Sequence, residues 1–225
     1  MIYVTGDCHG DITKFSDHQF KKIKEGDTLI ICGDFGFIWD GSEKEKKAID
    51  KLSKKKYKIL FVDGAHENFN LLNQYKLSRY KGGYVHKISD NILHLMRGEI
   101  YEIEGKKIFA MGGGESYDRE MRTEGETWWR EEIPSKDELA NGAKNLDEIE
   151  CDIDIVITHE APATTKEFLR LKTNEIVKVT PLNNYLDQLT ANVKYKHWYF
   201  GSLHIDLQIT ANMTAIFQNV AEIDV

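Results

Sequence analysis

Carboxylate and imidazole side chains follow short apolar runs of the sequence, at the points where those runs end. Two aspartates and four histidines occupy such positions: Asp7, His9, Asp34, His66, His159 and His204. Because ligands bind at the carboxyl ends of the strands in an open α/β sheet, we expect these side chains to meet at one edge. A mixed set of oxygen and nitrogen ligands suits manganese, iron or zinc better than calcium. The pattern therefore predicts a metal site.

The apolar runs have the composition of buried strands. Each is short, rich in β-branched or aromatic residues and bounded by turn residues; they cover residues 2–4, 28–32, 59–62, 153–157 and 198–200. The spacing of apolar residues between the first runs predicts helices, which cover residues 11–24, 43–56 and 67–75. Alternating strands and helices are typical of an α/β sheet covered by helices.

The second half of the chain carries a different pattern. Apolar and polar residues alternate over 83–113, with turns at 89–91 and 104–106, which predicts antiparallel strands. The same alternation over 207–217 predicts a hairpin that turns near Asn212.

Two further segments carry signals of helix N-termini. Ser135 is followed three residues later by Glu138, as in a capping box, and Thr180 precedes Pro181, which suits the first position of a helix. The sequence contains no internal repeat, linker or low-complexity tract. We therefore expect residues 1–225 to form a single domain.

Composition excludes several classes of protein. The sequence has 225 residues, of which 41% are hydrophobic and 30% charged, so it can form a sizeable core. Its net charge of −7, from 30 Lys+Arg and 37 Asp+Glu, works against non-specific binding to nucleic acid or to anionic membranes. No apolar run approaches the roughly 18 residues of a membrane span, and the N-terminus lacks the regions of a signal peptide. Three cysteines in no metal-ligand spacing argue against a disulfide framework, so we expect a cytoplasmic protein.

Five ordered motifs resemble those of the calcineurin-like metallophosphoesterases, in the bacterial and phage-type branch of that family. The family patterns DxHG, GDxG, GNHE, THxxP and GHxH correspond in order to residues 7–10, 33–36, 64–67, 158–162 and 201–204. The resemblance implies a four-layer α/β/β/α sandwich of two mixed sheets flanked by helices. It also implies a centre of two divalent metal ions, with manganese expected and iron, zinc or nickel as alternatives.

The resemblance further assigns the metal ligands. Asp7, His9 and His204 would bind the first ion, and Asp34 would bridge to the second ion, which His159 would also bind. Two ions held in this way activate a water molecule for attack on phosphorus.

His66 would face the scissile phosphate and donate a proton to the departing oxygen. The activity implied is hydrolysis of phosphoesters, as a phosphodiesterase or a phosphatase. The protein-phosphatase branch carries an arginine shortly after the second aspartate, and none follows Asp34 here. A small phosphoester or a nucleotide is therefore the expected substrate.

Two positions depart from the family pattern. Ala65 replaces the expected asparagine of GNHE, and Ser202 replaces the first histidine of GHxH, so the second ion loses two ligands. Three explanations are open. The chain is an engineered, inactivated variant, which we favour because both changes fall on one site. Alternatively, it is a natural protein that works with one ion or only binds its ligand, or other residues such as His197 or Glu160 supply the missing ligands.

The segment 112–133 is long and aromatic and resembles the SxDR…R…WW stretch of the same family branch. Arg119 and Arg122 in this segment could grip phosphate oxygens, and its tryptophans could stack on a ring. Alternatively, the tryptophans pack the segment onto the core and the arginines pair with nearby glutamates, which are Glu115, Glu120 and Glu124.

Two other functions compete with hydrolysis. A non-catalytic protein on the same scaffold would use the first ion and the arginines to hold a phosphorylated ligand or a nucleotide without cleaving it. The other alternative is an interaction module with a purely structural metal site. Removing the metal would then unfold the chain without affecting the binding of any phosphate ligand.

Overall fold

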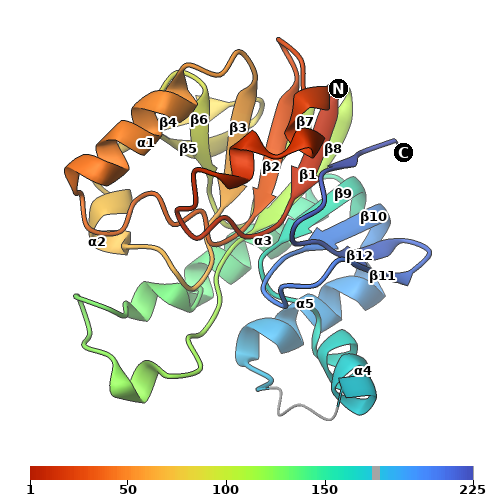
Figure 1. Cartoon of the computed structure of the whole chain (residues 1–225). Helices are drawn as coiled ribbons and strands as arrows, with labels where there is room; N and C mark the ends of the chain where they lie inside the picture. The colour runs from red at the N-terminus through yellow and green to blue at the C-terminus, as the bar shows by residue number, and fades with distance from the viewer. Residues whose placement is uncertain (174–177, 225) are drawn as a thin grey trace.

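Short β-branched and aromatic segments pair into two mixed sheets that lie face to face (Figure 1). The computed structural model describes residues 1–173 and 178–224. In these residues the first sheet has seven strands, in the order β13 (Ala221–Glu222), β1 (Ile2–Thr5), β2 (Thr28–Cys32), β3 (Lys58–Val62), β6 (Ile92–Leu95), β5 (Gly83–Lys87) and β4 (Lys76–Tyr80). The second has six, in the order β11 (Leu207–Thr210), β12 (Met213–Ala215), β10 (Lys194–Phe200), β9 (Asp152–Thr158), β8 (Lys106–Met111) and β7 (Glu99–Ile103).

The central strands of both sheets are parallel, and antiparallel strands close the edges. Strands β1, β2, β3 and β6 run parallel in the first sheet, as do β8, β9, β10 and β12 in the second. The carboxyl ends of the parallel strands in a sheet therefore lie along one of its edges.

Helices cover the two outer faces of the sandwich. The helices α1 (Glu43–Ser53) and α2 (Phe69–Leu72) bury Leu52 and Leu72 against the first sheet. On the second sheet, α3 (Lys136–Asp147) and α5 (Pro181–Asn192) bury leucines in the same way, and α4 (Ala163–Thr173) contacts α5. The expected α/β/β/α sandwich is confirmed.

Alternation along each strand divides the apolar side chains between separate cores. In β2, Leu29 and Ile31 pack toward the helices, whereas Ile30 packs toward the second sheet. Ile155 and Ile157 of β9 belong to the same inner core as Ile30. Such strands are covered on both faces, which explains why they are continuous apolar runs in the sequence.

Most elements agree with their predictions, and two helices do not. Residues 11–24 form two short 3₁₀ helices, Lys14–Ser16 and His18–Lys22, in place of one α-helix. The interruption is Asp17, which is extended and whose side chain accepts a hydrogen bond from the backbone N–H of Gln19. The helix predicted over 67–75 is reduced to α2, because it begins only after its N-cap Asn68. Helix α4 lies where no helix was predicted.

The antiparallel strands predicted over 83–113 are confirmed, but they lie in different sheets. Strands β5 and β6 form a hairpin in the first sheet, and β7 and β8 form one in the second. The chain passes between the sheets at Gly98, whose φ is +75°. A Cβ there would lie 2.6 Å from the backbone nitrogen of Gly142 in helix α3. Because the helix approaches so closely, position 98 requires glycine. The hairpin predicted to turn near Asn212 is β11 and β12.

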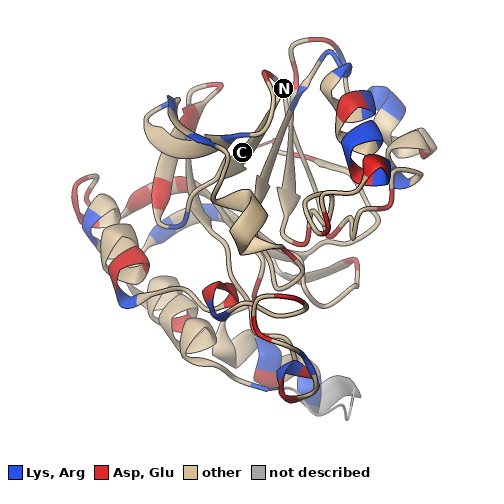
Figure 2. Cartoon of the chain, turned by 90° about the vertical axis from the view of Figure 1, so that its left-hand side faces the viewer, with Lys and Arg blue, Asp and Glu red and all other residues tan. Residues whose placement is uncertain are grey.

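The capping box at Ser135 and Glu138 and the start of α5 at Thr180 and Pro181 are confirmed. None of the helices in residues 1–173 and 178–224 is long and apolar enough to cross a membrane. Basic and acidic residues are interspersed over the helices and loops, as Figure 2 shows.

A buried ion pair joins the first sheet to the segment 112–133. The carboxylate of Asp63, just after β3, accepts a hydrogen bond of 2.9 Å from Nε of Arg97 and lies 3.0 Å from Nε2 of His94. Arg97 also donates to the backbone oxygen of Glu131, at 2.6 Å. The side chains of Asp63 and Arg97 are 1% and 4% exposed, so each charge depends on its partner for stabilisation.

Replacing Arg97 tests this dependence. The Arg97→Met substitution keeps the apolar stem but leaves the Asp63 carboxylate buried beside His94 alone. We expect the free energy of unfolding to fall by about 3–5 kcal/mol, measured by urea denaturation at pH 7. Arg79→Met, on the edge strand β4, is the control and should cost less than about 1 kcal/mol. A loss below about 1 kcal/mol at Arg97 would contradict the account.

Candidate metal centre

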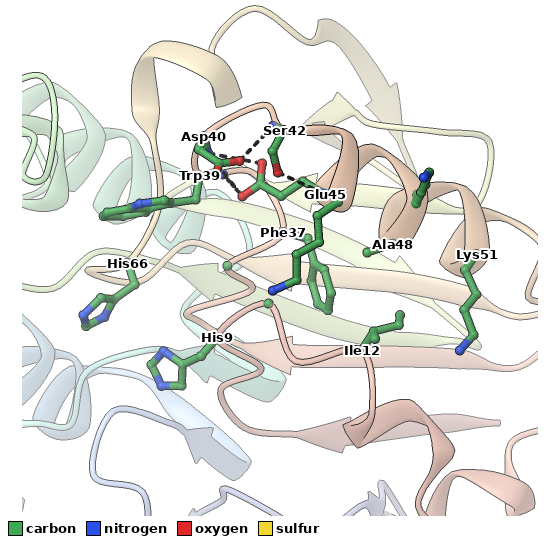
Figure 3. Close-up of a pocket in the computed structure, with 14 residues that line it drawn as sticks. His9, Ile12, Phe37, Trp39, Asp40, Ser42, Glu45, Ala48, Lys51 and His66 are labelled. Atoms are coloured by element: carbon green, nitrogen blue, oxygen red, sulfur yellow. Dashed lines mark hydrogen bonds between the residues drawn. The ribbon is translucent and has the colours of Figure 1, made fainter.

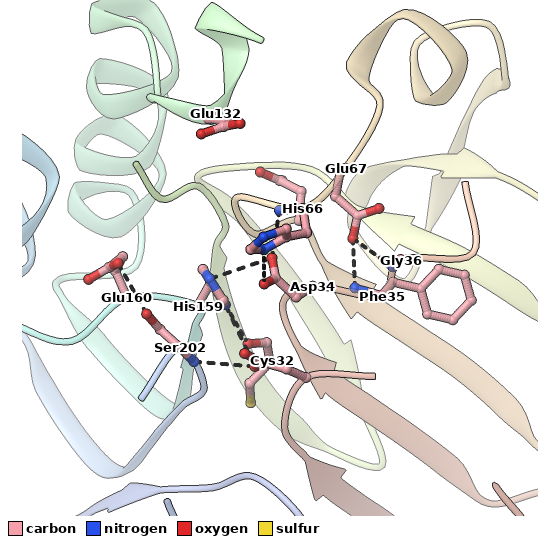
Figure 4. Close-up of polar contacts among 12 residues, drawn as sticks. Cys32, Asp34, Phe35, Gly36, His66, Glu67, Glu132, His159, Glu160 and Ser202 are labelled. Atoms are coloured by element: carbon pink, nitrogen blue, oxygen red, sulfur yellow. Dashed lines mark hydrogen bonds and ion pairs between the residues drawn. The ribbon is translucent and has the colours of Figure 1, made fainter. Parts of the chain in front are cut away.

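The six predicted ligand and catalytic residues lie in the loops that follow five parallel strands. Asp7 and His9 follow β1, Asp34 follows β2, and His66 follows β3. His159 and His204 follow β9 and β10 of the second sheet. Loops from the two sheets therefore meet at one edge of the sandwich, where the side chains of Asp34, His66 and His159 point toward one another (Figure 4). The structure brings all six predicted residues together.

Asp7, His9 and His204 form the first group of converging ligand atoms. One atom from each residue lies within 4.8 Å of the others. Oδ2 of Asp7 lies 3.8 Å from Nε2 of His9 and 3.2 Å from Nε2 of His204, and the two imidazole nitrogens are 2.9 Å apart. The same Oδ2 is buried and has no hydrogen-bond partner in the described residues. A buried carboxylate oxygen without a donor, faced by two imidazoles, fits a divalent cation.

Asp7, Asp34 and His159 form a second, fully buried group. Nδ1 of His159 lies 3.8 Å from Asp7, and Nε2 lies 3.6 Å from Asp34. Burial alone would lower the pKa of His159, but the adjacent carboxylates of Asp34 and Asp7 raise it to about 9. Burial likewise favours the neutral form of Asp34, but His159 and His66 hold the pKa of Asp34 below its usual value. The two carboxylates thus favour the charged form of the His159 imidazole.

His66 is held by Asp34 and faces an open groove. Its Nδ1 lies 2.7 Å from Oδ2 of Asp34, and its backbone N–H donates to Oδ1 at 2.8 Å. The hydrogen bond to Asp34 raises the pKa of His66, although burial opposes this effect. Its side chain is 41% exposed, and its Nε2 has no partner in the part of the chain that the structure describes.

Several of these residues have unusual backbone conformations. His9, Asp34, Ser202 and His204 have φ values of 46°, 43°, 65° and 50°, respectively. L-residues with positive φ are strained, and such strain is typical of functional sites. The loops therefore direct these side chains inward in backbone conformations that cost free energy.

The two departures from the family pattern lie at the group around His159. A Cβ on Gly114 would lie 3.2 Å from Cδ2 of His159 and 3.3 Å from the Cβ of Ala65, so Ala65 and His159 border the same space. The backbone N–H of Ser202 donates to Asp7 at 3.2 Å, and its hydroxyl donates to Oε1 of Glu160 at 3.1 Å (Figure 4).

Neither proposed substitute ligand joins a cluster. Glu160 is buried, and its carboxylate accepts hydrogen bonds from Lys166 at 2.7 Å, from Asn183 at 2.8 Å and from Ser202. His197 lies within β10, where its Nε2 is 2.9 Å from the hydroxyl of Thr214. Among the described residues, the groups of converging ligand atoms include neither Glu160 nor His197.

The arginines of the segment 112–133 have acidic partners. Arg119 pairs with Glu115 at 2.5 Å, and Arg122 pairs with Asp118 at 2.7 Å. Arg122 is also close enough to His66 for its charge to oppose protonation there, which lowers the pKa of His66 slightly against the larger effect of Asp34. Contact of either arginine with a substrate stays a prediction.

The tryptophans of this segment divide between two environments. Trp129 is 2% exposed and belongs to the core of the first sheet, where it packs edge-on against Trp39 with ring centroids 5.2 Å apart. Trp128 is only partly buried. At Trp129 the structure agrees with the alternative in which a tryptophan packs the segment onto the core.

Two buried ionisable residues that support the site had no assigned role in the sequence. Glu67 accepts hydrogen bonds from the backbone N–H groups of Phe35 at 2.6 Å and Gly36 at 3.4 Å, and so fixes the loop that carries Asp34 (Figure 4). Lys14 donates to backbone oxygens of the loop after β1, including that of Asp7 at 2.7 Å. Only the position of Glu67 beside His66 could have indicated its role.

Comparison with known proteins agrees with this geometry. The model of the calcineurin-like phosphoesterase family matches residues 1–209. This chain belongs to that family. Calcineurin-like phosphoesterases hydrolyse phosphoesters with divalent metal ions, and the clusters described above are candidate ligands for such ions.

One solved structure similar to this calcineurin-like phosphoesterase is the crystal structure of a phosphopantetheinyl hydrolase from Mycobacterium tuberculosis. The two chains are 14% identical, with a TM-score of 0.46, over 96% of this chain and 87% of the other. A search of curated proteins found no match.

Metal binding at the first group can be measured directly. We expect Mn²⁺ to raise the melting temperature of the wild-type chain, because an ion that binds only the folded state stabilises it. Loss of a residue that only hydrogen-bonds to a metal ligand costs roughly 10–100-fold in metal affinity. We expect Asp7→Asn, which changes a ligand itself, to weaken Mn²⁺ binding by more than this in calorimetry. Asp11→Asn is the control, since that carboxylate is exposed and, among the described residues, accepts hydrogen bonds from Thr13 alone. Equal affinity in both variants would contradict the assignment.

Proposed function

We propose that this protein hydrolyses a small phosphoester or a nucleotide, phosphodiesters included, and that Ala65 and Ser202 weaken its second metal site. The observation that carries the proposal is the unpartnered Oδ2 of Asp7, which faces two imidazoles at the edge where both sheets end. We further propose that residues 1–225 form one catalytic domain.

The groups of converging ligand atoms support a particular assignment of residues to the two ions. Asp7, His9 and His204 would hold the first ion, with Asp34 between the two sites and His159 on the second ion. Carboxylates combined with imidazoles suit manganese, and also iron, zinc or nickel. Bound divalent ions polarise phosphate oxygens and make water a nucleophile near neutral pH.

His66 is the proposed proton donor. Asp34 holds Nδ1 and so fixes the ring, which leaves Nε2 directed away from the carboxylate. Nε2 can then give a proton to the oxygen that leaves phosphorus. We propose that Arg122 and Arg119 contribute positive charge on the phosphate side. The charge of Arg122, which opposes protonation of His66 and so lowers its pKa, supports this placement.

A second function remains consistent with the site. Ser202 directs its hydroxyl to Glu160, and Ala65 offers no ligand atom, so neither side chain adds a ligand to the group around His159. A protein with this defect could bind a phosphorylated ligand or a nucleotide without cleaving it.

Restoring the two ligands distinguishes the functions. We expect the Ala65→Asn/Ser202→His variant to hydrolyse bis-p-nitrophenyl phosphate with Mn²⁺ at least about 100-fold faster than this chain, because electrostatic stabilisation by the second ion returns. Ser202→Ala is the matched control and should not gain activity. Ligand binding without turnover in every variant would favour the binding protein, and equal turnover in all variants would refute the role of the second site.

The role of His66 predicts a dependence on the leaving group. In the restored variant, His66→Gln should lower kcat by about 10²–10⁴ for a dinucleoside phosphate, whose leaving alkoxide needs a proton. The loss should be much smaller for a p-nitrophenyl ester, whose leaving group is stable as an anion. Mn²⁺ affinity should change little, and the exposed His18→Gln should behave as the parent. Equal losses for both esters would exclude proton donation by His66.

A further inference from the structure

A groove of about 490 Å³ opens directly from the metal centre and runs along helix α1 (Figure 3). His9 and His66 line one end of the groove, and Lys51 lines the opposite end. The volume is within the range of small-molecule sites. Because two residues of the metal centre also line the groove, a phosphoester held at the centre would direct one of its organic groups into it.

The wall of the groove between the two histidines and Lys51 is apolar (Figure 3). Ile12, Phe37 and Ala48 line it, and Trp39 lies at the end near His66, with ring centroids 6.4 Å apart. Trp39 is kept in place by its contact with Trp129. This wall suits an aromatic or aliphatic group attached close to the phosphorus.

The two carboxylates that line the groove, Asp40 and Glu45, are engaged by backbone groups. Glu45 accepts hydrogen bonds from the N–H of Trp39 at 2.9 Å and of Gly41 at 2.9 Å. Asp40 accepts one from the N–H of Ser42 at 2.8 Å. Figure 3 shows these carboxylates gathered over the turn that precedes α1. Their acceptor atoms are thus used to shape the turn.

Three lysines along α1 have no such partners. Lys44, Lys47 and Lys51 line the groove, and in residues 1–173 and 178–224 the structure gives none of them an ion pair. Their spacing places them on one side of the helix over about 10 Å. Two neighbouring lysines, Lys46 and Lys54, pair with Glu43 at 2.9 Å and with Asp50 at 2.6 Å, respectively.

We propose that the groove selects substrates whose organic group is apolar next to the phosphorus and carries a second anion at its far end. The lysines would bind this second anion, either a carboxylate or a phosphate. This inference specifies the substrate class of the proposed hydrolysis. It rests on the proposed function only because the ligand of the groove is called a substrate.

Calorimetry with three product-like monoesters tests the groove without requiring turnover. With Mn²⁺ present, 3-phenylpropyl phosphate is compared with the analogues that carry a para carboxylate or a para phosphonate. We expect the added anion to tighten binding about tenfold, as two or three partly exposed ion pairs would, and the gain to shrink at high salt. A larger gain for the phosphonate than for the carboxylate would identify a phosphate as the preferred anion.

Two matched variants locate the effect. Lys47→Gln/Lys51→Gln should remove the gain from the added anion and leave the affinity of 3-phenylpropyl phosphate within about twofold. Lys46→Gln/Lys54→Gln changes the paired lysines of the same region and should keep the gain. The inference is overturned if the added anion gives no gain in the wild type, or if both variants lose it equally.

The outcome is separable from that of the proposed function. If the restored variant hydrolyses no phosphoester but the lysine-dependent gain is present, the proposed hydrolysis fails and the groove is still a site for apolar anions. If hydrolysis occurs without the gain, the proposed function stands and the groove has no part in selecting the second anion.

Discussion

Two buried carboxylates that share one imidazole are the constraint around which the loops of this protein are arranged. The side chains of Asp7 and Asp34 are 0% and 4% exposed, and His159 lies between them. Such charges are costly unless they are compensated, so the imidazole or a cation must stay in contact with both. The backbone must then approach very closely. A Cβ on Gly33 would lie 2.1 Å from Nδ1 of His159, and a Cβ on Gly201 would lie 2.2 Å from Oδ1 of Asp7.

The sequence predicts the parts of this arrangement that depend on strand ends. An apolar run that stops at glycine and aspartate marks both the strand and the side chain that follows it, as at Asp34. Period-two alternation, however, does not say which sheet a hairpin joins, so the separation of β5–β6 from β7–β8 was not predictable. Contacts such as Arg97 with Asp63, or Glu67 with Phe35, join residues more than thirty positions apart and leave no spacing signal.

The two departures from the family pattern are accommodated without leaving a buried polar side chain unsatisfied. Ala65 is small and buried beside His159, so it adds no polar group that requires a partner. Ser202 finds an acceptor in Glu160, whose charge is already balanced by Lys166 at 2.7 Å. Because buried polar groups are costly only when unsatisfied, both residues fit their loops at little expense in stability. The scaffold thus accommodates both Ala65 and Ser202.

The same side-chain contacts hold the groove and the candidate metal centre in place. Trp39 contacts His66 on one side and Trp129 on the other, and the segment that carries Trp129 is fixed to the first sheet through Arg97. A protein of net charge −7 repels a doubly anionic substrate at long range. Salt screens that repulsion beyond about 8 Å, whereas the unpaired lysines of α1 attract an anion at contact distance. Under the proposed selectivity, charge would favour a doubly anionic substrate only in the orientation that places its far end along the helix. The same orientation would present its phosphorus to His66.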